Sequence, residues 1–336
     1  MTDASFRLVD AQNTAAGLPF KALVDALETG FANGCVVPAR HHHQLEKTGE
    51  PVATLLLMPA WAKPDDQDQF LGVKLVTVVP GNAARSVPGL TSTYILYDAV
   101  TGQQLCLMDG NVITSRRTAA TAALGARLLA REDARSLLVI GAGRVGSLIP
   151  DAYRAVRPIE KVSVWDIQPE AAQKLVRSLN ERGIIAEVVR DLETAIAATD
   201  IVTAATLATE PVIKGKCIRK GTHIDLIGAF TPRMRESDDA ALAMSRAFVD
   251  TDEALHEAGD LVQPIEGGVV SKEHILGTLA DLAHGKLKGR TTADEITYFK
   301  AVGSGLADLV AARMVYKSFY APDRISATTL RPASVE

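Results

Sequence analysis

Cysteine is scarce in this sequence: its three residues, Cys35, Cys106 and Cys217, lie far apart. They form neither a CxxC pair nor a spacing typical of a zinc site. Secreted domains that depend on disulfides use denser cysteine patterns, whereas dispersed thiols are typical of a reducing compartment. We therefore expect a cytoplasmic protein whose cysteines are not bonded to one another.

Long apolar runs are also missing. No segment approaches the roughly 20 consecutive apolar residues that cross a bilayer as a helix. The start, MTDASFRLVD, lacks the basic and apolar regions of a signal peptide. Neither sign of charge dominates, since 36 Lys and Arg face 40 Asp and Glu and give a formal net charge of -4. Without a basic block, we expect neither nucleic acid nor a membrane as a partner.

The composition is that of a globular protein. Of the 336 residues, 47% are hydrophobic and 23% are charged, and a chain of this length suggests about two domains. In the N-terminal part, KALVDALETGFAN has the spacing of an amphipathic helix. Successive strands are predicted in PVATLLLMPAW, FLGVKLVTVVP, STYILYDAVTG and QLCLMD, with AVTGQQ as the turn of a hairpin. This mixture predicts an α+β domain with a sizeable sheet.

The pattern changes at residue 115, where SRRTAATAALGARLLARED is alanine-rich and predicted to be helical. Short apolar strands then alternate with helices, which predicts a parallel sheet covered by helices. The predicted strands are SLLVI, KVSVWD, IIAEVV, DIVTAAT, THIDLIG and AFVD. The predicted helices include AAQKLVRSLNERG, LETAIAAT, MRESDDAALAMS and a long helical segment, TADEITYFKAVGSGLADLVAARMVYKSFY, broken near Gly303 and Gly305.

The segment SLLVIGAGRVGSLI carries a glycine motif, Gly141-x-Gly143-x-x-Gly146. Such a motif alone is weak evidence, but here an apolar strand ends at Ile140 and a helix is predicted to begin near Arg144. In a dinucleotide-binding turn, the first glycine permits the tight turn and the second lets the backbone approach the pyrophosphate. The third lets helix and strand pack closely, and the helix N-terminus faces the phosphates.

The next strand supplies an acidic residue that completes this motif. KVSVWD ends in Asp166, and a carboxylate about 20 residues beyond the glycines accepts hydrogen bonds from the adenosine ribose. It also repels a 2′-phosphate, so NADH is mildly favoured over NADPH, although Gln168 and its neighbours could accommodate a phosphate. The complete set favours dinucleotide binding over a Rossmann-like turn that binds no phosphate. Pro150 is expected to kink the following helix locally.

Two adjacent arginines, Arg116 and Arg117, are predicted to stand at the start of a helix capped by Thr114 or Ser115. Cations at a helix N-terminus are disfavoured by roughly 0.3–1 kcal/mol each. Two solvated arginines could bear that cost, which is one interpretation. The other is an anion held between a guanidinium and the helix dipole. A carboxylate suits that site because arginine binds it through two hydrogen bonds.

Lys74 interrupts the apolar strand LGVKLVTVVP. A lysine in such a strand must reach solvent, find an anion or lose its charge. It could lie at a sheet edge and extend its amine to water. The flanking residues are apolar on both faces of the strand, which favours a position in a cleft.

The run HHHQ at positions 41–44 invites a metal-binding interpretation. Consecutive residues of a strand point to opposite faces, so three successive histidines cannot all bind one ion. No acidic or cysteine partner stands at a recognisable spacing. We therefore predict no metal site and place His41, His42 and His43 in a loop near a pocket, with no role assigned.

Four segments together resemble one family. They are GVKLVTVVPGN, YDAVTGQQLCLMDGNVITSRRTAATAALGARLLA, LLVIGAGRVG and EITYFKAVGSGLADL. From about residue 35 to about residue 318 the sequence resembles the ornithine cyclodeaminase/μ-crystallin family. The resemblance implies an α/β fold and a homodimer. A Rossmann-type parallel sheet would form the dinucleotide-binding domain, residues 119–299. An α+β domain for substrate binding and dimerisation would comprise residues 1–118 with 300–336.

The resemblance also implies roles for single residues. Family lysines at the position of Lys74 line the pocket beside the substrate, and arginines at that of Arg117 pair with the substrate carboxylate near the nicotinamide. Arg40 is expected to match a further carboxylate-binding arginine. Lys74 and Arg117 are thus the expected catalytic residues. The expected cofactor-binding residues are Arg117, Thr118, Gly141, Gly143, Arg144, Val145, Gly146, Asp166, Thr206, Gly228 and Phe230.

One departure from the family pattern bears on the reaction. True ornithine cyclodeaminases have a segment like GGDCPGK, whose aspartate acts on amine and water, whereas this sequence reads GAFTPR and holds Phe230 at that position. Phe230 can transfer no proton, and Asp225 on the preceding strand is not expected to replace the aspartate. Deamination needs that acid–base chemistry. Reduction of an imine already formed needs a hydride, an oriented carboxylate and a proton source.

The segments PARHHH, LLLMPAW and GAFTPRMRE are similar to the family branch that reduces Δ1-pyrroline-2-carboxylate and Δ1-piperideine-2-carboxylate. The expected function is therefore NADH- or NADPH-dependent reduction of these cyclic imine carboxylates to L-proline and L-pipecolate. The alternatives are an ornithine cyclodeaminase, an alanine or N-alkyl amino-acid dehydrogenase, and a crystallin-like binding protein without turnover. The intact lysine and arginine argue against the last.

Overall fold

The computed structural model describes residues 6–85 and 87–320. The contacts within the chain divide it into two compact units. The first unit contains the segment up to Ala26, Gly34–Thr114 and the segment from Gly305, and the second contains Leu27–Asn33 and Ser115–Ser304. The sequence suggested divisions after residues 118 and 299. The roles in substrate binding, dimerisation and dinucleotide binding given to the two parts remain predictions.

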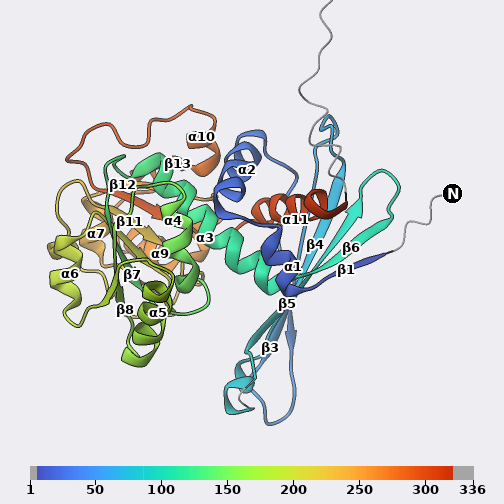
Figure 1. The fold of residues 1–336 in the computed structure, drawn as a ribbon, viewed down its shortest axis with the longest axis horizontal. Helices are drawn as coiled ribbons and strands as arrows, with labels where there is room; N and C mark the ends of the chain where they lie inside the picture. The colour runs from blue at the N-terminus through green and yellow to red at the C-terminus, as the bar shows by residue number, and fades with distance from the viewer. Residues whose placement is uncertain (1–5, 86, 321–336) are drawn as a thin grey trace, which may run out of the picture. The chain divides into compact units, whose positions relative to one another are not determined.

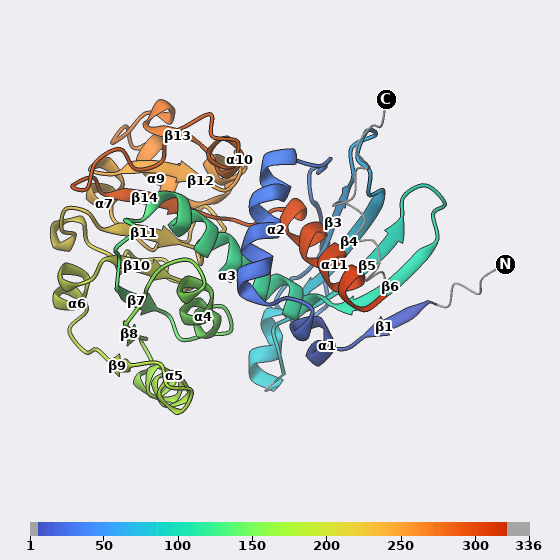
Figure 2. The same cartoon turned by 45° about the horizontal axis from the view of Figure 1, so that its top comes forward.

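A six-stranded sheet forms the centre of the first unit (Figures 1 and 2). Its order is β1-β6-β5-β4-β3-β2, in which β1 pairs with β6 in parallel and the other neighbours are antiparallel. The predicted strands and the predicted hairpin between β5 and β6 are present, and β1 and β2 are additional. The strands are β1 (Arg7–Val9), β2 (His41–Leu45), β3 (Ala53–Trp61), β4 (Phe70–Val78), β5 (Leu90–Asp98) and β6 (Gln104–Asp109).

Helix α11 (Gly305–Tyr320) packs on β3, β4 and β5. Side chains of β4 alternate between the two faces of the sheet, so that Lys74 and Val76 are buried while Leu71 and Val73 are half-buried. Lys74 points to the face that α11 covers, because it pairs with a side chain of that helix. The other helices before β5 are α1 (Ala11–Ala16), α2 (Phe20–Asn33) and the 3-10 helix η1 (Pro80–Arg85).

The second unit is built on an eight-stranded sheet whose paired strands all run parallel. Its order is β13-β12-β14-β11-β10-β7-β8-β9. The predicted fold class, a Rossmann-type parallel sheet beside an α+β domain, is thus confirmed. The strands are β7 (Ser136–Ile140), β8 (Lys161–Trp165), β9 (Ala186–Val188), β10 (Ile201–Ala204), β11 (His223–Leu226), β12 (Arg246–Val249), β13 (Ile275–Thr278) and β14 (Thr297–Lys300).

Helices connect most of these strands (Figure 2). The first, α3, begins in the first unit and continues into the second. The α-helices are α3 (Gly110–Leu129), α4 (Ile149–Arg154), α5 (Pro169–Glu181), α6 (Leu192–Ala198), α7 (Asp239–Ala243), α8 (Ala254–Glu257), α9 (Gly259–Glu266) and α10 (Leu279–Ala283). The 3-10 helices are η2 (Gly146–Leu148), η3 (Gly215–Cys217) and η4 (Lys272–His274).

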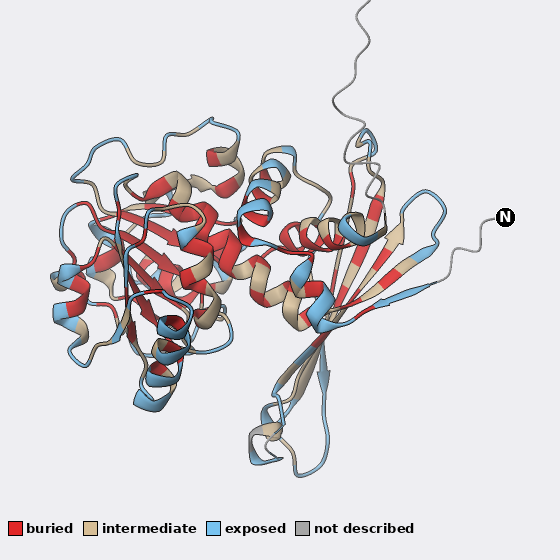
Figure 3. Cartoon of the chain, in the orientation of Figure 1, coloured by how far each residue is buried: buried red, intermediate tan, exposed pale blue. Residues whose placement is uncertain are grey.

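Burial explains why most strands of this sheet could be predicted from the sequence. The strands β7, β10, β11 and β14 are almost entirely buried (Figure 3). Their apolar side chains, among them Leu138, Val202 and Ile224, belong to one core cluster. Parallel strands covered on both faces consist of nearly continuous apolar runs, which is how the segments SLLVI, DIVTAAT and THIDLIG were predicted.

Near the C-terminus, the predicted long helix was wrong over its first half. Thr297–Lys300 forms the buried strand β14, and α11 begins only at Gly305. Gly303, with φ +89°, lies between them. The stretch TYFK is too short to show a period, and its threonine and two aromatic residues suit a buried strand. The sequence also gave no indication of β13.

The histidine run was predicted as a loop, and that prediction was wrong. His41, His42 and His43 belong to β2, an exposed edge strand paired with β3. Within residues 6–85 and 87–320, no three or more His, Cys, Asp or Glu side chains are grouped so that they could hold a metal ion. No helix in these ranges is long and apolar enough to span a bilayer.

Candidate active site

The glycine motif forms the turn that follows β7. Gly141 has φ +98°, in the left-handed region that favours glycine. A Cβ on Gly146 would stand 1.8 Å from the carbonyl oxygen of Gly141, so a side chain does not fit there. A Cβ on Gly143 would meet nothing within 4 Å, so this part of the backbone is open to a ligand. The turn therefore has the glycine requirements of a pyrophosphate cradle.

The chain enters the following helix later than predicted. Arg144 and Val145 form a turn, Gly146–Leu148 form η2, and α4 begins at Ile149. Pro150 therefore lies in the first turn of α4, where its missing N–H breaks no intrahelical hydrogen bond. The helix predicted to begin near Arg144 thus begins at Gly146 as the 3-10 helix η2, and the local kink at Pro150 stays a prediction.

Asp166 lies directly after β8, beside the glycine turn. Its Oδ2 accepts a hydrogen bond of 2.7 Å from the backbone N–H of Ala142. Its Oδ1 accepts one of 2.8 Å from the backbone N–H of Gln168. The two bonds hold a half-buried carboxylate at the end of the second strand of the motif, as a ribose-binding acid requires.

Glu236 ties together the loops that follow β10 and β11. One carboxylate oxygen accepts hydrogen bonds from the backbone N–H and the hydroxyl of Thr206, at 2.7 and 2.9 Å. The other accepts from the backbone N–H groups of Gly228 and Ala229, at 2.8 and 3.2 Å. Thr206 and Gly228 were predicted from the sequence and are thus brought together. Glu236 was missed because its segment had been read as part of a helix.

The charge of Glu236 is balanced inside the second unit. Lys300 Nζ lies 3.6 Å from a carboxylate oxygen of Glu236 and 3.1 Å from one of Asp260, and all three side chains are fully buried. Burial raises the pKa of Glu236, and the Lys300 charge acts against that rise. Removal of one partner from such a cluster leaves an uncompensated buried charge.

Helix α3 begins earlier than the arginine pair. It starts at Gly110, and the Asp109 side chain accepts a 2.8 Å hydrogen bond from the Val112 N–H. That contact has the geometry of an N-cap. The predicted cap at Thr114 or Ser115 was therefore wrong. Arg116 and Arg117 lie in the second turn, beyond the N–H groups on which the predicted dipole penalty rested.

Arg117 is buried at the carboxyl end of the parallel sheet. Its guanidinium lies against Gly303, where a Cβ would stand 2.6 Å from Nη1. Asp250, directly after β12, accepts a 2.7 Å hydrogen bond from the Gly303 N–H. Burial raises the pKa of Asp250. Hydrogen bonds from the backbone N–H groups of Gly303 and its neighbours, together with the Arg117 charge, lower it. Thr118, the next residue of α3, is half-buried.

In the first unit, Lys74 forms a buried ion pair. Its Nζ lies 2.6 Å from Oδ2 of Asp308, in the first turn of α11, and the two side chains are 3% and 1% exposed. Because β4 lies between β3 and β5, the edge-strand interpretation of Lys74 was wrong. The anion that Lys74 needs is supplied by its own chain. The signal for Asp308 was an acidic residue within the otherwise apolar segment GLADLV.

Arg40 is half-buried and directly precedes β2. Slight burial and then the Arg40 charge lower the pKa of His42. His41 and His43 point to one face of the strand, with ring centroids 6.5 Å apart. Two histidines that share a face do not complete a metal site by themselves.

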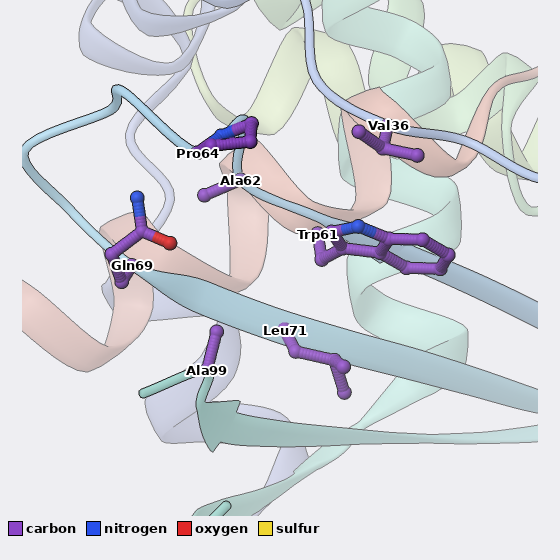
Figure 4. Close-up of a pocket in the computed structure, with 7 residues that line it drawn as sticks. All are labelled: Val36, Trp61, Ala62, Pro64, Gln69, Leu71 and Ala99. Atoms are coloured by element: carbon purple, nitrogen blue, oxygen red, sulfur yellow. The ribbon is translucent and has the colours of Figure 1, made fainter. Parts of the chain in front are cut away.

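A pocket of about 370 Å³ opens in the first unit (Figure 4). Trp61 and Leu71 are directly opposite one another on β3 and β4. Along β4, the side chains of Leu71 and Lys74 point to opposite faces of the sheet. None of the lining side chains carries a charge, so the pocket offers no acid or base for catalysis. Its lining residues are Val36, Trp61, Ala62, Pro64, Gln69, Leu71 and Ala99.

Two other predicted positions lie on or directly after β11. Asp225 is fully buried within the strand, where Oδ2 accepts hydrogen bonds from the hydroxyls of Tyr153 and, at 2.9 Å, Thr203. Burial raises its pKa to about 7. Phe230, in contrast, is 45% exposed in the segment after the strand. The interior place of Asp225 agrees with the expectation that it does not replace the missing aspartate.

Comparisons with known proteins show which family this chain belongs to. The Delta(1)-pyrroline-2-carboxylate reductase of Paracoccus denitrificans is 42% identical over 271 residues, which are 80% of this chain and 84% of that protein. Thermococcus litoralis Delta(1)-pyrroline-2-carboxylate reductase, solved in complex with NADH and L-proline, has a TM-score of 0.87 at 33% identity and covers 93% of this chain and 97% of that chain.

An archaeal alanine dehydrogenase dimer with bound NAD has a TM-score of 0.85 at 27% identity, with coverage of 98% of this chain and 99% of that chain. The model of the ornithine cyclodeaminase/mu-crystallin family matches residues 8–322. The match spans both units of the structure and includes the glycine turn, Lys74 and Arg117. The chain therefore belongs to the ornithine cyclodeaminase/mu-crystallin family.

Proposed function

We propose that this protein is an NADH- or NADPH-dependent reductase of cyclic ketimine carboxylates. It forms L-proline from Δ1-pyrroline-2-carboxylate and L-pipecolate from Δ1-piperideine-2-carboxylate. The observation that carries the proposal is the buried Arg117 guanidinium at the carboxyl end of the parallel sheet. Ligands of open parallel sheets bind at that edge. The bacterial and archaeal relatives named for reduction of the five-membered imine support the same reaction.

A nicotinamide dinucleotide fits the second unit. The backbone at Gly141, Gly143 and Gly146 would hold the pyrophosphate, since the turn is open at Gly143. Asp166 would accept hydrogen bonds from the ribose, and its charge would disfavour a 2′-phosphate, so we propose a preference for NADH. When bound, the cofactor supplies the hydride. The further residues proposed to contact it are Arg117, Thr118, Arg144, Val145, Thr206, Gly228 and Phe230.

Three side chains would handle the substrate. Arg117, supported by Arg40, would hold the carboxylate through charge-assisted hydrogen bonds. This fixes the imine carbon for hydride addition, and orientation of that kind contributes to the rate. Lys74 would lie beside the ring, where it either hydrogen-bonds the carboxylate or gives its proton to the ring nitrogen. A protonated imine is the better hydride acceptor.

Cyclodeamination of ornithine is the less favoured reaction of the family for this chain. Phe230 occupies the position of the aspartate that such enzymes use, and it carries no titratable group. Asp225 is buried within β11 and engaged by two hydroxyls. A site without that acid is suited to an imine that is already formed.

An open-chain substrate is the second candidate. It is favoured by the likeness of this chain to the archaeal alanine dehydrogenase, at 27% identity over nearly the whole length. Pyruvate with ammonia, or with methylamine, tests it directly. Cofactor oxidation with these substrates that exceeds the rate with the cyclic imines would favour this candidate over the reductase.

The proposed function is tested with purified protein, NADH and each of the two cyclic imines. Oxidation of NADH with formation of proline or pipecolate is expected. Tight cofactor binding without turnover of any of these substrates would indicate a non-catalytic binding protein. The buried Arg117 and the paired Lys74 argue against that outcome.

We also propose that the protein is a homodimer of the cytoplasm. The sheet face opposite α11 carries Leu71, Val73 and Leu75, which are half-buried within a single chain. An apolar face of this kind is typical of an interface, and one solved relative is a dimer. The free thiols of Cys35, Cys106 and Cys217 suit a reducing compartment. A monomer found by light scattering at micromolar concentration would contradict the dimer.

A further inference from the structure

Asp308 and Lys74 come from distant parts of the chain and meet inside the first unit. Lys74 lies in the middle of β4, and Asp308 lies in the first turn of α11. Their side chains are almost completely buried, and Nζ lies 2.6 Å from Oδ2. Because α11 packs on β3, β4 and β5, the helix fixes the carboxylate above the strand.

The pair controls the charge state of both groups. Burial alone favours the neutral amine and the neutral carboxyl, whereas an opposite charge at hydrogen-bond distance favours both ions. Charge-assisted hydrogen bonds are also stronger than neutral ones. The first turn of α11 adds a favourable dipole for the carboxylate. Loss of Asp308 would remove this stabilisation of the ammonium form, so burial would lower the pKa of Lys74 and favour release of its proton.

We propose that Asp308 is a positioning residue for the reaction: it keeps Lys74 an ammonium ion, in a fixed place, so that Lys74 can protonate the imine. The proposal rests on the proposed reductase function and deepens it. An N–H bond of Lys74 breaks and an N–H bond forms at the ring nitrogen, which gives an iminium ion. The hydride that NADH or NADPH supplies adds to C2, and the nitrogen keeps the electron pair of the former π bond. Lys74, now a neutral amine, regains a proton from solvent.

Tyr94 and the two cysteines that influence its pKa do not compete with Asp308 for Lys74. Tyr94 stands directly opposite Lys74 on β5, and Met58, opposite on β3, does not titrate. Burial and then the Asp308 charge raise the pKa of Tyr94 well above its usual value. Burial also raises the pKa of Cys35 to about 11 and that of Cys106 to about 12. These hydroxyl and thiol groups are neutral near pH 7, so none of them supplies a negative charge to Lys74.

The test is the pH profile of kcat with Δ1-pyrroline-2-carboxylate in wild type and in Asp308→Asn, which keeps the shape of the side chain and removes its charge. The alkaline limb should move to lower pH by about one unit or more, since an opposite charge shifts a titration by about 1–3 units. On the alkaline side of the wild-type limb the rate should therefore fall roughly tenfold or more, and it should approach that of wild type as the pH falls. The imine titrates equally in both proteins. A loss that is uniform across pH, or an unchanged profile, overturns the proposal.

Two variants control this experiment. Asp308→Glu retains the charge and should keep the alkaline limb of wild type, even if its rate is lower. Asp68→Asn removes another carboxylate that pairs with α11, through Arg313 at 3.0 Å and through Lys317. It should leave the profile unchanged. A shift of the limb in Asp68→Asn as large as in Asp308→Asn would mean that the effect comes from loosening the helix.

A measurement without substrate separates this proposal from the proposed function. The titration of Lys74 can be followed by NMR of its ε-carbon in the wild-type protein, which requires no variant to fold. Lys74 should keep its proton to at least as high a pH as exposed lysines do, in spite of its burial. Loss of the proton near neutral pH would overturn the role of Asp308, whatever the substrate. Failure of imine reduction together with the expected titration would instead contradict the reductase function, and with it the catalytic use of the pair.

Discussion

The Arg117 guanidinium lies against the backbone of Gly303, where a Cβ would stand 2.6 Å from Nη1 and 2.9 Å from Nη2. Gly303 has φ +89°, and Asp250 accepts hydrogen bonds from its N–H and from that of Val302. The bend after β14 is therefore shaped around the arginine. Within the second unit, the position of this cation is set by the fold at the edge of the sheet where ligands bind.

Replacement of Arg117 by methionine should nearly abolish imine reduction. Truncating one partner of a buried, hydrogen-bonded charge pair costs about 2–5 kcal/mol, which corresponds to roughly 30-fold to several-thousand-fold in kcat/KM. The measurement is the initial rate of NADH oxidation with Δ1-pyrroline-2-carboxylate. Arg127→Met, on the same helix and paired with Glu28, is the matched control and should keep most of the rate. Wild-type kinetics in Arg117→Met would remove Arg117 from the site.

Substitutions at two glycines of the turn should have different effects, one on stability and the other on cofactor binding. Gly146→Ala would place a Cβ 1.8 Å from the Gly141 carbonyl oxygen, so it should lower the melting temperature markedly. Gly143→Ala meets nothing within 4 Å and should melt as wild type does. It should nevertheless weaken NADH binding, because its methyl group would occupy the approach to the pyrophosphate. Calorimetry and NADH fluorescence titration provide the two readouts. Wild-type NADH affinity in Gly143→Ala would contradict the assigned cradle.

Asp166 should set the preference between the two cofactors. Asp166→Asn removes the charge but can still accept the hydrogen bond from Ala142. Hydrogen bonds to charged groups contribute about 1.5–3 kcal/mol, so kcat/KM with NADH should fall roughly tenfold or more. The value with NADPH should fall less or rise. The ratio of the two values is the quantity to measure, and an unchanged ratio would show that another residue decides the preference.

Asp225 and Asp200 should have opposite effects on the pH dependence of stability. Burial raises the pKa of Asp225 to about 7, so its contribution is fully present below its unfolded pKa of about 3.9 and is lost as pH rises through the folded value. For Asp200, burial is outweighed by hydrogen bonds from Arg135 and Ser136 and by the Arg219 charge, and the pKa falls to about 2. That contribution is present above the unfolded pKa and is lost as pH falls through the folded value.

Urea unfolding of Asp225→Asn and Asp200→Asn tests these signs. Asp225→Asn should gain stability relative to wild type between about pH 4 and about pH 8, by an amount on the order of a few kcal/mol. Asp200→Asn should be less stable than wild type at neutral pH, and the difference should shrink toward about pH 2. If the difference between Asp225→Asn and wild type did not change with pH, Asp225 would titrate normally.

The parts of the fold that could be predicted from sequence are those with a strong local signal. The buried strands of the parallel sheet consist of apolar runs, and the glycine turn with Asp166 is compact in sequence. Lys74 stood out because it interrupts an apolar strand. Arg117 stood out as one of two adjacent arginines at a predicted helix start, although the helix that carries it begins earlier, at Gly110.

What could not be predicted depends on contacts between distant segments. Lys74 and Asp308 are separated by 234 positions, and Glu236 acts on loops that belong to other strands. In each case the residue type is ordinary and only the fold gives it a partner. The strand β14 was missed for a related reason. Its four residues are too few to show a period, and their strand conformation is set by pairing with β11 and β12.

The central claim is that the chain reduces a preformed cyclic imine and does not deaminate ornithine. The direct measurement is the absorbance of NADH during incubation with Δ1-pyrroline-2-carboxylate, alongside incubation of ornithine with NAD and assay of proline. We predict rapid NADH oxidation in the first reaction and no proline in the second. Proline from ornithine without imine reduction would contradict the account. Some other group would then have to supply the acid–base catalysis that Phe230 cannot, because its side chain has no titratable proton.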